Sequence, residues 1–90
     1  MGSLEECMLE ALTSKRELLG TIAVQMTEDV NNGVLSPDTI RQHSIAVDNL
    51  DAAAIWLEKC DYAQAMHFYS RGCSNMGEFK GRADKERKKS

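Results

Sequence analysis

Apolar residues recur at intervals of three, four and seven positions along the first third of the chain. This period places them on one stripe of an amphipathic helix. The residues of the stripe are Leu4, Met8, Leu12, Leu19, Ile22, Met26 and Val30. Ser3 and Glu6 have the spacing of a capping box, and Asn31-Asn32-Gly33 is a sequence that ends helices. The pattern therefore predicts a helix over residues 4–31.

A second helix is predicted directly after this break. Ser36-Pro37-Asp38 places a capping residue, a proline and an acidic residue where the start of a helix favours them. The apolar positions that follow with helical period are Ile40, Val47, Leu50, Ala54 and Leu57. They predict a helix over residues 37–59, and Ile45, Ile55 and Trp56 widen its apolar face. A face of this width indicates a helix with a neighbour on each side.

The third helix is predicted to begin at Tyr62, because Asp61 and Gln64 repeat the capping-box spacing. Its apolar face comprises Tyr62, Ala65, Met66, Tyr69, Cys73 and Met76, and it is expected to end near residue 78. Small residues predict a close approach of the second and third helices, with Ala65 at their crossing. These residues are Ala52, Ala53, Ala54, Ala65 and Gly72. Since short connections force neighbouring helices to run antiparallel, the sequence predicts an all-α antiparallel three-helix bundle.

Charge divides the chain into two parts. Residues 80–90 carry six basic and two acidic side chains, whereas residues 1–79 carry five basic and twelve acidic ones. The last segment has no large apolar residue, so we expect a helical bundle domain over 1–79 and a basic, flexible, solvated tail or frayed helix over 80–90. The acidic body is not expected to bind nucleic acid. No run approaches the ~18 apolar residues that a membrane span requires.

Cysteine and histidine are the residues of this sequence that are considered for metal binding or catalysis. Three cysteines form an odd set in a short chain, which predicts reduced thiols and a cytoplasmic protein. Cys60, His67, Cys73 and His43 do not have the paired spacings of zinc sites, and no oxyanion hole is apparent for a cysteine nucleophile. We therefore expect no enzymatic activity, metal or cofactor. A small metal-binding protein or enzyme that uses Cys60, His67 and Cys73 is the alternative.

Residues 52–72, AAAIWLEKCDYAQAMHFYSRG, resemble one helical hairpin of the tetratricopeptide family. In that family small residues precede a large one on the first helix, and Asp-Tyr follows a short break. The matching positions are Ala52, Ala53, Trp56, Asp61, Tyr62, Ala65, Tyr69 and Gly72. The turn carries Cys60 where the repeat usually has glycine. The same D-Y-x-x-A-x-x-x-Y pattern is similar to helices two and three of microtubule-interacting-and-trafficking domains, which are three-helix bundles of about this length.

The expected function is protein–protein interaction. The chain has more large apolar side chains than a bundle of this size can bury, and Trp56, Met66, Tyr69 and Met76 are the candidate partner-binding residues. At least one of Trp56 and Tyr69 is expected to be partly exposed. We predict a non-enzymatic adaptor or co-chaperone subunit that binds a helix or peptide of another protein in a groove between two helices.

Two alternatives to this function stay open. The long first helix, the turn with glycine and the Ala-rich second helix are also similar to small acidic co-chaperones of type III secretion needle subunits. The exposed apolar stripe could instead meet a second copy of the chain and form a homo-oligomer.

Overall fold

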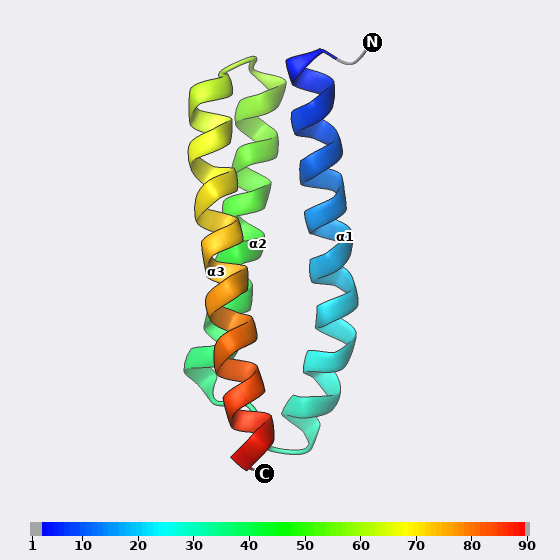
Figure 1. Ribbon diagram of the computed structural model, residues 1–90, viewed down its shortest axis with the longest axis vertical. Helices are drawn as coiled ribbons and strands as arrows, with labels where there is room; N and C mark the ends of the chain where they lie inside the picture. The colour runs from blue at the N-terminus through cyan, green and yellow to red at the C-terminus, as the bar shows by residue number, and fades with distance from the viewer. Residues whose placement is uncertain (1–2, 90) are drawn as a thin grey trace.

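Three long helices joined by two short turns account for most of residues 3–89, which are the residues described in a computed structural model of the protein. Helix α1 spans Leu4–Asn31, α2 spans Pro37–Glu58 and α3 spans Tyr62–Lys89. Figure 1 shows that α2 runs antiparallel to both other helices, so that α1 and α3 point in the same direction. The predicted all-α three-helix bundle is confirmed.

Each helix begins with a side chain that caps it. The capping acceptors are Ser3, Ser36 and Asp61, and the donors are the backbone N–H groups of Glu6, Thr39 and Gln64, at 3.2, 3.3 and 3.1 Å. Each bond satisfies one of the N–H groups that the first turn of a helix leaves without an intrahelical partner. The predicted bounds of α1 and α2 therefore agree with the structure to within one residue.

The ends of α1 and α2 share one hydrogen-bonding motif. After α2, Cys60 has a φ of 60°, its N–H donates to the carbonyl of Leu57, and the Asp61 N–H donates to the carbonyl of Trp56. After α1, Gly33 has a φ of 70° and takes the equivalent place. This is the Schellman motif, whose left-handed position favours glycine. Cys60 therefore occupies a position where the backbone favours glycine.

Helices α2 and α3 approach closely because small residues line their contact. Ala46, Ala53 and Ala65 are fully buried at 0% exposure, and Gly72 faces the fully buried Leu50. A Cβ atom added at Gly72 would lie 2.7 Å from Leu50 Cδ2. Of the small residues predicted for this approach, Ala53, Ala65 and Gly72 are buried, and Ala52 and Ala54 are half-buried.

Helix α1 packs less completely against this hairpin. Its buried apolar side chains are Met8, Leu12 and Leu19. Within residues 3–89, most of the large apolar side chains that remain exposed also belong to it. They are Leu4, Leu9, Leu18, Val24 and Val30 on α1, Ile55 on α2 and Met66 on α3. Helix α1 therefore leaves apolar surface open along its flanks.

The structure differs from the expected tail over residues 80–89. These residues continue α3 as regular helix to Lys89, so the bundle does not end at residue 79. Phe79 and Ala83 are 2% and 0% exposed and pack with Leu35 in a second apolar cluster. The sequence argument counted only large apolar residues, whereas Ala83, one helical turn after Phe79, extends this cluster into the segment. Residues 1, 2 and 90, which the predicted domain and tail also included, lie outside the described residues.

Two charged residues of this segment also bind the other helices. Arg87 makes a salt bridge with Asp29 of α1, with 2.6 Å between Nη2 and Oδ2, and Asp29 is only 6% exposed. Glu86 Oε1 accepts a hydrogen bond of 2.9 Å from the backbone N–H of Ser36. In a capping box this N–H is bound by Glu or Gln three residues after the cap. Here that position is Thr39, and Glu86 of α3 supplies the carboxylate instead.

The contact between Gly72 and Leu50 yields the first prediction. We expect Gly72→Ala to lower the free energy of unfolding by about 1–3 kcal/mol, because overpacking against Leu50 outweighs the gain in helix propensity. Gly77→Ala is the matched control, since its Cβ would lie in open space beside the backbone of its own helix. It should stabilise the protein by up to ~1 kcal/mol. Chemical denaturation measures both values. Equal effects of the two variants would contradict the close approach of α2 and α3.

A second prediction concerns the salt bridge of Arg87. Arg87→Gln leaves the buried Asp29 carboxylate without its cation and should destabilise the protein by about 1–3 kcal/mol. This is less than for a fully buried pair, because the Arg87 side chain is 34% exposed. Arg82→Gln, which removes an exposed pair with Glu78, should change stability by less than about 0.5 kcal/mol. If residues 80–89 were a solvated tail, both variants would have the melting temperature of the wild type in thermal melts.

A third prediction follows from Glu86. Hydrogen bonding by Ser36, and secondly by Thr39, lowers the pKa of the Glu86 carboxyl below its ordinary value of 4.5. The ionised form is thus favoured by folding, so its stabilisation is present above pH 4.5 and is lost as pH falls through the folded-state pKa. Glu86→Gln should therefore be less stable than wild type at neutral pH, and the difference should shrink in acid. Denaturation across pH measures this, and a constant difference would refute it.

Candidate functional site

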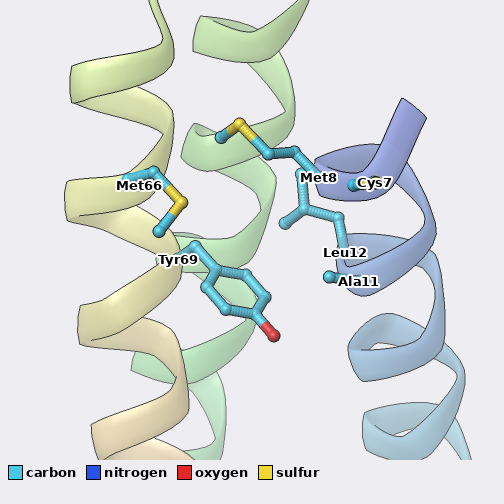
Figure 2. A pocket seen from close by; sticks show the side chains of 6 residues that line it. All are labelled: Cys7, Met8, Ala11, Leu12, Met66 and Tyr69. Atoms are coloured by element: carbon cyan, nitrogen blue, oxygen red, sulfur yellow. The ribbon is translucent and has the colours of Figure 1, made fainter. Parts of the chain in front are cut away.

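An apolar cavity lies between α1 and α3 near the start of both helices (Figure 2). Its volume is about 180 Å³. The lining residues are Cys7, Met8, Ala11 and Leu12 of α1 and Met66 and Tyr69 of α3. We call this space the N-terminal cavity.

The helical period explains why these side chains meet. Cys7 and Ala11 are four residues apart on α1, and Met66 and Tyr69 are three apart on α3, so each pair shares one helix face. Figure 2 shows Met66 and Tyr69 extending from α3 toward α1. The small side chain of Ala11 leaves space that a larger residue would fill. The cavity is therefore built into the packing of α1 on α3.

Burial distinguishes the floor of the cavity from its rim. Met8 and Leu12 are 7% and 2% exposed and form the floor, where they also belong to the main core. Met66 is 50% exposed and Cys7 is also exposed, so both lie at the rim. Such a site offers apolar contact area to a side chain that enters from solvent.

Tyr69 brings a hydroxyl group to this apolar lining. Burial, and secondly a hydrogen bond with Cys73, raises the pKa of the Tyr69 phenol above its ordinary value of 10.0. A tyrosine phenol is protonated at neutral pH and can donate a hydrogen bond. Figure 2 shows the hydroxyl directed toward α1. The cavity can thus bind an apolar group, with one hydrogen-bond donor at its side.

A second cavity of about 340 Å³ lies further along the same two helices. It is lined by Leu18, Thr21, Ile22 and Gln25 of α1 and by Phe79, Lys80, Asp84 and Arg87 of α3. We call it the C-terminal cavity, and the two cavities together the α1–α3 groove. The second cavity is more polar, because the ionic contacts that hold the end of α3 border it.

The structure brings together two of the four candidate partner-binding residues. Met66 and Tyr69 both line the N-terminal cavity. Met76 is 8% exposed and packs in the main core, so it offers little surface to a partner. Trp56 is half-buried on α2, where Lys59 Nζ lies 4.9 Å from its ring centroid, and it does not line the cavity. Trp56 and Tyr69 are both half-buried, and Tyr69 is the one that lies at the groove.

Sequence reasoning missed the contribution of α1 to this site. Met8 and Leu12 were recognised only as members of an apolar stripe. The stripe alone did not say which part faces α2 and which part faces α3. Ala11 gave a usable signal, because a small residue beside two large apolar ones leaves a hollow on a helix face.

The cysteines and histidines of the sequence alternative are spread over the molecule. Cys60 is exposed in the α2–α3 turn, and His67 is exposed with its ring edge against Phe68. Among residues 3–89, no group of three or more His, Cys, Asp or Glu side chains could hold a metal ion. His43 is buried instead, with its Nε2 3.2 Å from the carbonyl oxygen of Leu19. Its ring therefore acts as a core side chain between α1 and α2.

Comparison with models of protein families, with curated proteins and with solved structures found no match. Within the described part of the chain, no helix is both long and apolar enough to cross a membrane. The likeness of residues 52–72 to tetratricopeptide and microtubule-interacting-and-trafficking hairpins stays a prediction from the sequence.

Proposed function

We propose that the protein is a non-enzymatic interaction module whose α1–α3 groove binds a segment of another protein. The observation that supports this proposal is the N-terminal cavity, which two helices line with apolar side chains and which has the half-exposed Met66 at its rim. An exposed methionine beside an open apolar cavity is the arrangement that an apolar side chain of a partner would complete.

The free energies of side-chain burial and of association favour binding along the whole groove over binding in one cavity. Full burial of one large apolar side chain contributes about 1.5–3 kcal/mol. Association costs at least ~4 kcal/mol in lost translational and rotational freedom, so one anchor in the N-terminal cavity does not give stable binding. A partner that also occupies the C-terminal cavity gains a second anchor and the contact area between them. We therefore assign the function to the whole α1–α3 groove.

A small adaptor or co-chaperone subunit in the cytoplasm is the form of this function that we propose. Cys7, Cys60 and Cys73 are free thiols, which fits a reducing compartment. The surface that remains for a partner lies mainly on α1, the helix with most of the exposed apolar side chains within residues 3–89. A partner that covers this helix would complete the bundle on its open side.

Two variants of the N-terminal cavity test this function. Met66→Gln removes the apolar rim, and Ala11→Leu fills the cavity from within. Each should weaken the binding of a captured partner by about tenfold, which corresponds to ~1.4 kcal/mol. Ile55→Gln is the matched control, because Ile55 is 53% exposed on α2 and lies outside the groove.

The measurement is affinity capture with the immobilised chain, followed by titration of the protein that co-purifies. Thermal melts of all three variants show whether the fold is kept. The proposal fails if Met66→Gln and Ala11→Leu bind as the wild type does, or if Ile55→Gln loses as much affinity.

A further inference from the structure

A further cavity lies between α1 and α2 and shares no lining residue with the α1–α3 groove. Its volume is about 350 Å³, which is within the range of small-molecule sites. Its walls are one face of α1, from Arg16 to Ala23, and one face of α2, from His43 to Asp51. Because Arg16 and Ala23 are seven positions apart, the cavity extends ~10 Å along the helix. We call it the α1–α2 cavity.

Gly20 leaves one wall of this cavity without a side chain. Glycine in the middle of a helix is less favourable than alanine. Gly72 of α3 is needed for close packing against Leu50, but a Cβ atom at Gly20 would lie in open space beside the backbone of its own helix. Packing therefore does not require glycine at position 20. Its missing side chain instead provides space in the α1–α2 cavity.

His43 brings a hydrogen-bond acceptor to the cavity. The residue is only 7% exposed, and two neighbours fix its ring. Nε2 lies 3.2 Å from the carbonyl oxygen of Leu19, and the ring makes an edge contact with Phe79. Because a carbonyl oxygen can only accept, Nε2 carries the proton, and in the neutral ring Nδ1 has the free lone pair. Within residues 3–89, Nδ1 has no hydrogen-bond partner.

The α1–α2 cavity gives access to this nitrogen. In the described part of the chain, Oε2 of Glu86 is the side-chain oxygen or nitrogen that is both fully buried and unpaired. Nδ1 of His43 is unpaired but is not fully buried, so a molecule from solvent can contact it. His43 lines the α1–α2 cavity and neither cavity of the α1–α3 groove. A donor group in the α1–α2 cavity would therefore satisfy an acceptor that the fold leaves free.

The charged residues of the cavity are already paired with each other. Because α1 and α2 run antiparallel, Arg16 and Asp51 lie at the end opposite to His43. Arg16 Nη2 lies 3.1 Å from Asp51 Oδ1. An ionised ligand would have to displace one member of this pair or lose its hydration against Leu19 and Val47, which is unfavourable. The cavity therefore favours an uncharged ligand.

We propose that the α1–α2 cavity binds a small uncharged molecule of about one ring, with one hydroxyl or N–H group that donates to His43 Nδ1. Its ring contacts the apolar side chains of Leu19, Val47 and Leu50. Phenol has this size and chemistry. The site is distinct from the α1–α3 groove, and the inference does not depend on the proposed function.

Phenol and benzonitrile test the inference with the full-length chain. Both consist of one ring and leave water about equally readily, but phenol can donate a hydrogen bond, whereas benzonitrile can only accept one. In NMR titrations, phenol should bind about fivefold or more tightly, which is the effect of one added hydrogen bond. Phenol should also move the nitrogen resonance of His43 Nδ1 upfield, and benzonitrile should not.

Protein variants locate the binding. Gly20→Leu fills the cavity and should weaken the binding of phenol about tenfold or more. Gly81→Leu is the matched control, because Gly81 is also a helical glycine beside open space, but on α3 and outside the cavity. It should change affinity by less than about twofold, as should Met66→Gln in the α1–α3 groove. His43→Phe keeps a ring but removes the acceptor, so phenol should lose its advantage over benzonitrile.

Several results would overturn this inference. They are equal binding of phenol and benzonitrile by the wild type, a His43 Nδ1 resonance that phenol does not move, and a Gly20→Leu variant that binds phenol as the wild type does. Loss of phenol binding in Met66→Gln or Gly81→Leu would also overturn it, because the ligand then lies elsewhere. If His43→Phe does not fold, the Nδ1 resonance of the wild type decides. None of these results bears on partner binding in the α1–α3 groove.

Discussion

The close approach of α2 and α3 at Gly72 is the contact on which the rest of the structure depends. Gly72 has no Cβ, so the Leu50 side chain can lie against the backbone of α3. Alanines at 0% exposure extend this contact along both helices. With so little side-chain volume between them, α2 and α3 form a narrow hairpin, and α1 must pack on its outside with one face only. The exposed apolar flanks of α1 are a consequence of this arrangement.

Contacts of the last turns of α3 fix the C-terminal end of the groove between α1 and α3. At the C-terminal end, Arg87 holds Asp29, and Phe79 packs with Leu35. Toward the N-terminal end, the side chains that face across the groove leave the N-terminal cavity beside the exposed Met66. The contacts at the C-terminal end are thus ionic as well as apolar, whereas apolar side chains predominate around the N-terminal cavity.

Local signals in the sequence predicted where the helices begin, but they carry no information on contacts between residues that are distant in the chain. Ser36-Pro37 and Asp61 marked helix starts correctly, because capping depends on neighbours a few residues away. The end of α3 was missed, because its contacts are distant in the sequence. Arg87 binds a residue 58 positions away, and Glu86 binds one 50 positions away. In the candidate site, Met66 and Tyr69 followed from their residue type. Their neighbours Cys7 and Ala11 depended on the rotation of α1 about its axis, which periodicity does not fix.

The hydrogen bond from Ser36 to Glu86 ties the first turn of one helix to the last turns of another. Because Arg87, the next residue, binds the end of α1, three helix termini meet at one place. Fraying of the last turns of α3 would release the start of α2 and the end of α1 in the same event. During synthesis these residues follow both other helices, so the connection between α1 and α2 acquires its final structure only after α3 has been made. The bundle thus closes through the last turns of α3.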